Sequence, residues 1–91
     1  MPISWPRENL MIGSTGEKVR FIQSALNRIS DNYPLIPKLV TDGIYGPKTR
    51  NSVIVFQKIF LLPESGIVDF ATWYKISDIY VGLSRIAELN T

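Results

Sequence analysis

Two short stretches decide the fold of this chain: GIYGPKT at residues 43–49 and GIVDFAT at residues 66–72. They align without gaps at an offset of 23 (66 − 43), with glycine, isoleucine and threonine in register. The glycine supplies a backbone angle that other residues resist, and we expect the isoleucine after it to enter the core. The fourth residue, Gly46 or Asp69, then takes the N-cap position of a helix, and the threonine hydroxyl at N3 can bond back toward that cap. The repeat therefore predicts two helices that begin from the same turn.

The first predicted helix covers about residues 15–30. Ser14 and Glu17 have the spacing of a capping box, in which the serine hydroxyl accepts from the N3 amide and the glutamate reaches back to the cap. Apolar residues then recur three and four positions apart, as on the buried face of a helix. These residues are Val19, Ile22, Leu26 and Ile29.

The second predicted helix begins at Gly46-Pro47. Proline suits the first helical position because its missing N–H would have no partner there. Residues 53–56 (VIVF) alone could pass for a buried strand, but the length of the pattern and the Gly-Pro start favour a helix. Pro63 is expected to end it, because the residue before a proline avoids the helical region. Its inward face is predicted to carry Thr49, Val53, Phe56 and Phe60.

The third predicted helix begins after Asp69, a good N-cap. It carries an apolar seam that could run to the end of the chain, or Ser77-Asp78 could cap a new helix. Residues 31–42, with two prolines, form a long loop whose apolar residues are expected to pack partly on the bundle. The predicted fold class is all-α: a three-helix bundle with glycine turns before the helices, an internal pseudo-repeat and an extended C-terminal helix. The seam consists of Trp73, Ile76, Tyr80, Leu83 and Ala87, and Ile86 and Leu89 lie near its end.

The composition excludes several kinds of site. The chain has 91 residues, a single-domain length, and contains no cysteine and no histidine. It therefore lacks the side chains of most zinc sites, of cysteine nucleophiles and of the imidazole general base. The net charge of +2 is weak and its charges are interspersed, unlike the basic face of a nucleic-acid binder. No apolar stretch is long enough to span a membrane and the first residues are not a signal peptide, so an export signal is expected on a larger parent protein.

Three sequence motifs occur in order along the chain. They are L-x-x-G-x-x-G-x-x-V-x-x-L-Q-x-x-L over residues 10–26, D-G-x-[FY]-G-x-x-T-x-x-A-V-x-x-F-Q over residues 42–57, and G-x-[VL]-D-x-x-T-W over residues 66–73. Ile22 stands in place of a leucine and Ser52 in place of an alanine. With these motifs the chain resembles the type-1 peptidoglycan-binding domain, a three-helix module attached to bacterial cell-wall hydrolases.

The resemblance implies a domain over residues 10–76. Pro2 and Pro6 predict an extended lead-in over residues 1–9, and the apolar seam predicts a helical extension over residues 77–91, beyond the usual end of the family. The resemblance also implies non-catalytic, non-covalent binding of peptidoglycan, either its glycan strand or its stem peptide. Such a domain would anchor a larger hydrolase outside the cell, at the wall or the spore cortex. No cofactor, metal, nucleic acid or membrane is expected as a partner, and a monomer is expected within the multidomain protein.

Six side chains near the glycine turns and in the long loop are candidates for ligand binding: Tyr45, Arg50, Thr41, Asp42, Lys48 and Tyr33. Tyr45 offers an aromatic face and a hydroxyl that suit a sugar ring, or it leans on the stem of Arg50. Arg50 and Lys48 could take the carboxylates of stem peptides, or they could be solvated helix surface. The carboxylate of Asp42 equally suits a turn, where it accepts from nearby amides.

Two amide side chains have a structural interpretation. Gln23 and Gln57 each follow a core residue, so they are expected to satisfy backbone groups of the loops. Lys38, in the long loop, is a weaker binding candidate.

The sequence leaves functions of other classes open. A nucleic-acid-binding three-helix domain would need a contiguous basic face, and an assembly module could use the seam of residues 77–91. An enzyme is the least favoured, because glycoside hydrolysis needs two carboxylates across a cleft. The eight acidic residues here fall mostly at caps and turns.

Overall fold

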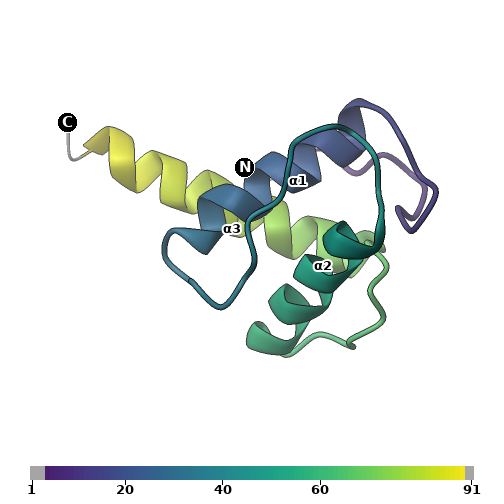
Figure 1. Ribbon diagram of the computed structural model, residues 1–91. Helices are drawn as coiled ribbons and strands as arrows, with labels where there is room; N and C mark the ends of the chain where they lie inside the picture. Colours follow the sequence, from purple (N-terminus) through teal and green to yellow (C-terminus); the bar gives the residue numbers. More distant parts are fainter. Residues whose placement is uncertain (1–3, 90–91) are drawn as a thin grey trace.

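Three helices make up the regular structure of the computed structural model, which describes residues 4–89. Helix α1 spans Glu17–Ser30, α2 spans Pro47–Ile59 and α3 spans Phe70–Leu89 (Figure 1). Within residues 4–89 the strand-like pairing is limited to isolated bridges. None of the described helices is both long and apolar enough to cross a membrane. The predicted all-α, three-helix class is confirmed.

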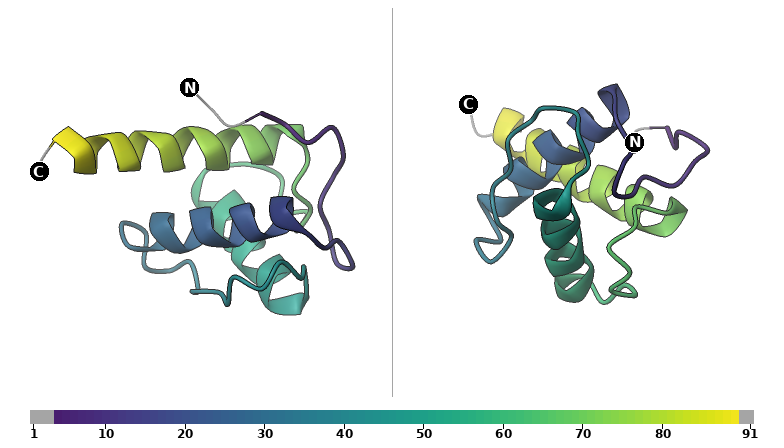
Figure 2. Two further views of the ribbon diagram at one scale, coloured as in Figure 1. Left: turned by 90° about the horizontal axis from the view of Figure 1, so that it is seen from above. Right: turned by 45° about the vertical axis from the view of Figure 1, so that its right-hand side comes forward.

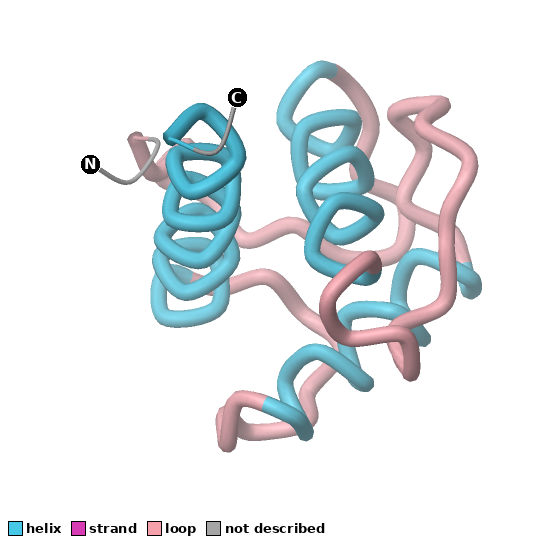
Figure 3. Tube along the Cα trace, turned by 90° about the vertical axis from the view of Figure 1, so that its left-hand side faces the viewer, coloured by secondary structure: helices cyan, strands magenta, loops and turns pink. Residues whose placement is uncertain are grey.

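Helices α1 and α3 lie side by side and run in the same direction, while α2 crosses beneath them (Figures 2 and 3). The core fills the space between the three helices and consists of side chains that are almost completely buried. Helix α3 is the longest of the three and extends past the end of α1 (Figure 2). The largest of these core side chains are Tyr45, Phe56, Ile22, Leu26, Ile29, Ile36 and Ile76.

Helix α3 is continuous, so the chain does not break at Ser77-Asp78. Ser77 is buried, and its hydroxyl donates to the carbonyl oxygen of Tyr74 (3.1 Å) within the same helix. Because its hydroxyl is bonded within α3, Ser77 does not act as the N-cap of a separate helix. The sequence left open a continuous helix or a second helix capped by Ser77-Asp78, and the structure has the continuous helix.

The second half of α3 packs partly on its own domain. The ring of Tyr80 lies 5.6 Å from that of Phe21 on α1, and Nη2 of Arg28 donates to the carbonyl oxygen of Leu83 (3.4 Å). Further along the helix, Ile86 is 56% exposed. The seam positions Ala87 and Leu89 lie outside the described side chains.

The predicted capping box before α1 is wrong. The N-cap is Gly16, with a φ of 115°, and it makes no side-chain cap bond. The Ser14 hydroxyl instead accepts from the backbone N–H of Met11 (3.0 Å). The reason is tertiary: the N–H of Gly16 donates to the carbonyl of Gly43 (2.9 Å), so the chain before α1 is held by the first glycine turn.

Helix α2 confirms the Gly46-Pro47 start but ends earlier than expected, at Ile59 rather than just before Pro63. Leu61 takes a left-handed φ of 59°, and the N–H groups of Leu61 and Leu62 bond back to the carbonyls of Lys58 (3.3 Å) and Gln57 (2.8 Å). This pair of bonds is a Schellman motif, which ends a helix without proline.

The long loop before α2 packs on the bundle as expected. Ile36 is buried, at 1% exposed, and its carbonyl accepts from the hydroxyl of Ser30 (2.7 Å). Asn27 on α1 binds the backbone of Leu39 twice, accepting its N–H and donating to its carbonyl, both at 2.7 Å. These bonds fix the loop against α1.

A third bond ties this loop to α2. The hydroxyl of Ser52 donates to the carbonyl oxygen of Pro37 (2.8 Å). An alanine, which the family motif has at this position, could not make the bond. The departure from the motif is therefore explained by the long loop, which Ser52 helps to hold.

Candidate functional site

Two glycine turns, one before α2 and one before α3, form the most regular feature of the domain. Gly43 has a φ of 74° and Gly66 a φ of 72°, so both adopt the left-handed conformation that their place in the repeat predicted. Each glycine N–H donates to the side-chain oxygen of a buried glutamine: Gly43 to Gln23 (2.9 Å) and Gly66 to Gln57 (3.0 Å). The structural interpretation of both glutamines is confirmed.

Each glutamine nitrogen completes the same network at its own turn. Nε2 lies within hydrogen-bond distance of three oxygens: the side chain before the glycine, the carbonyl after it and the threonine at N3 of the helix. The predicted bond from each threonine back toward its cap is replaced by this contact with glutamine. The distances are 3.1, 3.0 and 3.1 Å from Gln23 to Asp42, Ile44 and Thr49, and 3.2, 3.0 and 3.1 Å from Gln57 to Ser65, Ile67 and Thr72.

The isoleucines of the two turns do not enter the core, contrary to the prediction. Ile44 is 57% exposed, whereas the next residue, Tyr45, is 1% exposed. Tyr45 pairs with the segment before α1 through bonds to Ser14 (2.9 Å) and Gly13 (3.0 Å). This pairing extends the backbone, so successive side chains point to opposite sides and only the second is buried. At the other turn Ile67 is only partly buried, whereas Val68 is buried and pairs with Leu10.

Tyr45 is part of the core and not an accessible ring. Its hydroxyl donates to the carbonyl oxygen of Gly66 (2.7 Å) and so joins the two turns. Burial raises the pKa of this phenol above its usual value, and the nearby charge of Arg50 opposes that effect only partly. The expectation that Tyr45 offers a face to a sugar is therefore wrong, because its ring and its hydroxyl are both occupied.

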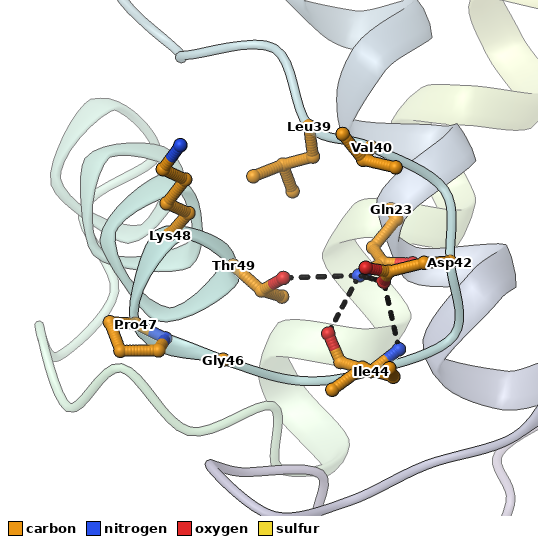
Figure 4. Close-up of a pocket in the computed structure, with 9 residues that line it drawn as sticks. All are labelled: Gln23, Leu39, Val40, Asp42, Ile44, Gly46, Pro47, Lys48 and Thr49. Carbon is orange, nitrogen blue, oxygen red and sulfur yellow. Dashed lines mark hydrogen bonds between the residues drawn. The ribbon is translucent and has the colours of Figure 1, made fainter.

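A groove lies between the long loop and the start of α2, and we call it the α2 groove. It consists of two adjoining pockets of about 470 and 440 Å³ that share Leu39, Pro47 and Lys48. The polar groups of Gln23, Thr49 and Asp42 line the larger pocket (Figure 4). The remaining residues of the larger pocket are Val40, Ile44 and Gly46, and those of the smaller one are Pro37, Lys38 and Asn51.

The α2 groove has aliphatic walls and one free group of each charge. The N–H of Ile44 and the amide of Gln23 donate to Oδ1 of Asp42 and hold the pKa of that carboxyl below its usual value. Its Oδ2 makes no hydrogen bond within residues 4–89. Lys48 has no ion-pair or hydrogen-bond partner in the same range. Figure 4 shows Asp42 and Lys48 on opposite sides of the larger pocket.

The predicted site residues do not all meet at this groove. Asp42 and Lys48 line it, and Thr41 is exposed beside Asp42. Tyr33 is elsewhere, with its ring 5.0 Å from that of Phe60. Arg50 lines a separate, smaller pocket of about 250 Å³ beside the second turn.

Sequence reasoning missed most of the groove wall. Leu39 and Val40 were assigned only to a loop, and Ile44 was assigned to the core. The sequence contained one signal of this wall, because the loop is unusually apolar. In the structure Val40 of this loop is nevertheless 77% exposed. Lys38 also lines the groove, but its ammonium is bound to the Asp31 carboxylate and to the carbonyl of Asn27 (2.9 Å).

No group of three or more acidic, histidine or cysteine side chains is placed to hold a metal ion within the described part of the chain. The α2 groove presents aliphatic walls, a carboxylate and an ammonium, a set of groups that suits non-covalent binding.

The chain is similar to known proteins in sequence and in fold. Residues 15–76 match the family described as "Putative peptidoglycan binding domain". The crystal structure of the SleB N-terminal domain superposes with a TM-score of 0.72 at 25% identity, covering 85% of this chain and 99% of that one.

A peptidoglycan-binding protein from Clostridioides difficile, solved in complex with glutamine hydroxamate, superposes with a TM-score of 0.68 at 30% identity. That match covers 80% of this chain but 42% of the other, so this chain spans less than half of the Clostridioides protein. No match is found among the curated proteins. Because the family match extends over well more than half of the chain, this protein belongs to the peptidoglycan binding domain family.

Proposed function

We propose that this chain binds bacterial peptidoglycan non-covalently and that the α2 groove is its contact surface. Membership of the family carries the first part of the proposal. The second part is supported by the groove itself, because it combines exposed aliphatic side chains with Asp42 and Lys48. Thr41, next to Asp42, is at the edge of the same surface.

We further propose that the domain serves a larger protein. Residues 10–76 would form the binding unit and residues 77–91 its helical extension, and the domain would hold a cell-wall hydrolase at the wall or the spore cortex. The structural relative from Clostridioides difficile is longer than this chain, which is consistent with such an arrangement. An open groove with few charged contacts is expected to bind weakly, about micromolar or worse, so that repeated sites on the polymer supply the retention.

Co-sedimentation with purified Gram-positive sacculi tests the proposal. We expect the wild-type chain to sediment with the sacculi above the level of an unrelated control protein. Val40→Arg places a long charged side chain on the groove wall at a position that is 77% exposed, so it should reduce the bound fraction without loss of stability. Leu35→Arg is the matched control, because Leu35 is 79% exposed in the same loop and does not line the groove.

Two results would contradict the proposal in different ways. If the wild type stays in the supernatant, peptidoglycan binding is wrong. If the wild type sediments and Val40→Arg sediments equally well, binding takes place at another surface. The small pocket that Arg50 lines is then the next surface to test, with Arg50→Ala.

A further inference from the structure

The two glycine turns of the pseudo-repeat can be compared residue by residue. The comparison shows which charged side chains of the first turn are not required to build such a turn. At an offset of 23, Asp42 corresponds to Ser65 (42 + 23). Both accept from the backbone N–H two residues later, at 3.0 Å in the first turn and 3.1 Å in the second. Both also lie within hydrogen-bond distance of their glutamine nitrogen, at 3.1 and 3.2 Å. A neutral hydroxyl therefore builds this turn as well as a carboxylate does.

The same comparison applies to Lys48. Its counterpart is Ala71 (48 + 23), at the second position of α3, so the helix start needs no ammonium there. Lys48 also has no partner within residues 4–89. The negative charge of Asp42 and the positive charge of Lys48 are thus both unnecessary for the architecture, and both line the same groove.

The walls of the groove narrow the class of ligand. Leu39, Val40, Ile44 and Pro47 are aliphatic, and no aromatic ring lines either pocket. Sugar rings are usually held by stacking on aromatic faces, and Tyr45, the one aromatic residue of the turn, is buried. Aliphatic walls between two opposite charges suit instead a peptide that carries an amino group and a carboxylate.

We infer that the α2 groove recognises the stem peptide of peptidoglycan rather than its glycan strand. The side-chain amine of the peptide's diamino acid binds the carboxylate of Asp42, and a peptide carboxylate binds the ammonium of Lys48. The aliphatic parts of the peptide lie on the groove walls. This inference rests on the proposed function, because it names the part of peptidoglycan that the same groove binds.

Two soluble peptides serve as probes: N-acetylated L-Ala–γ-D-Glu–X–D-Ala, with X either L-lysine or meso-diaminopimelate. Acetylation mimics the link to the glycan and leaves the diamino acid as the source of the amine. NMR titration of the full chain should shift amides of residues 39–49 with at least one of the two peptides. Asp42→Ser, which copies the second turn, and Lys48→Ala, which copies Ala71, should each weaken binding about fivefold.

Modified peptides show which charge meets which residue. When the side-chain amine is also acetylated, Asp42→Ser should have no further effect while Lys48→Ala still weakens binding. When the carboxylates are amidated, the pattern should reverse. Asp78→Ser and Lys58→Ala make the same charge changes at exposed positions outside the groove, so they should leave binding unchanged.

Failure of this inference can be told apart from failure of the proposed function. If sacculi bind the chain, but peptide-free glycan strands displace it and neither peptide does, stem-peptide recognition is wrong and peptidoglycan binding stands. If the peptides bind with equal loss for the Asp78→Ser and Asp42→Ser variants, the charge pairing is wrong. If sacculi do not bind, the proposed function itself fails.

Discussion

The hydroxyl of Tyr45 and the carbonyl oxygen of Gly66, 21 residues apart, are joined by a 2.7 Å hydrogen bond inside the core. Tyr45→Phe removes the hydroxyl and leaves a buried carbonyl without this donor. We expect the free energy of unfolding to fall by about 1–2 kcal/mol, which in a domain of this size lowers the Tm by roughly 4–8 °C per kcal/mol. Urea and thermal denaturation would measure the change. Tyr74→Phe, at a 50% exposed position on α3, is the control and should change little.

The same residue predicts a pH effect. Burial raises the pKa of Tyr45, so the folded chain keeps the phenol proton to a higher pH than the unfolded chain, where the tyrosine pKa is about 10. Above about pH 10 the unfolded state binds fewer protons, and the free energy of unfolding therefore falls as the pH rises. Denaturation at pH 8, 10 and 11 should show a steeper loss for the wild type than for Tyr45→Phe. Equal slopes would mean that Tyr45 titrates normally.

The two buried glutamines should respond differently to the same substitution. Glutamate in place of either can accept the glycine N–H but has no nitrogen to donate. At Gln23 the new carboxylate faces the carboxylate of Asp42, whereas at Gln57 it faces the hydroxyl of Ser65, which can donate to it. We expect Gln23→Glu to destabilise the domain more than Gln57→Glu at pH 7, by about 1–2 kcal/mol.

Acid should reduce that difference, because protonation of either carboxylate removes the repulsion and restores a donor. Urea denaturation of both variants at pH 7 and pH 4 tests this. If the two variants are equally stable at pH 7, the charge of Asp42 does not act on position 23.

Gly43 and Gly66 have different surroundings, so an alanine substitution is expected to have different effects at the two positions. At both, alanine would be strained by a φ above +70°. A Cβ on Gly43 would lie 3.1 Å from the carbonyl oxygen of Gly16, a backbone atom that cannot easily move. A Cβ on Gly66 would meet Arg50 Cγ at 2.8 Å, an atom of a flexible side chain. Gly43→Ala should therefore cost more than the roughly 1–2 kcal/mol of backbone strain, and the Gly66→Ala variant should be partly rescued by Arg50→Ala.

Gly82 in α3 is the control for this pair. Nothing lies within 4 Å of a Cβ added there, and its φ is not in the left-handed range. Gly82→Ala should raise the free energy of unfolding by up to about 1 kcal/mol through helix propensity. Rescue of Gly43→Ala by the Arg50→Ala change would contradict the assignment of the two contacts.

The sequence predicted those parts of the fold that depend on residues close together in the chain. Gly43 and Gly66 were identified because a left-handed residue before a helix favours glycine, and Gly46-Pro47 because proline suits a helix start. The orientation of Ile44 and Tyr45 was predicted wrongly, since it depends on pairing with Ser14, which is far away in the sequence.

The candidate site was predicted less completely for the same reason. The charges of Asp42 and Lys48 could be named from the turn and the helix start, where they are neighbours in sequence. The opposite wall of the groove could not, because Leu39 and Val40 reach it only through bonds from Asn27 and other side chains to the loop backbone. Such contacts between segments leave no periodic pattern in the sequence.

Asn27 therefore offers a test of how the groove is held open. Its side chain accepts the N–H of Leu39 and donates to the carbonyl of Leu39, both at 2.7 Å, and Leu39 is shared by both pockets of the α2 groove. Asn27→Ala removes both bonds, and the partly exposed site lets water replace them, so we expect a loss of only about 1 kcal/mol in the free energy of unfolding. The amide of Leu39 should exchange with solvent faster, while amides in the middle of α1 keep their protection.

The same substitution should weaken binding. Sedimentation of Asn27→Ala with sacculi should fall even at temperatures where the variant remains fully folded. Asn32→Ala is the matched control, since Asn32 is exposed and bonds to the half-buried side chain of Arg28 and within its own turn. Faster exchange at Leu39 with unchanged sedimentation would show that binding does not depend on this wall.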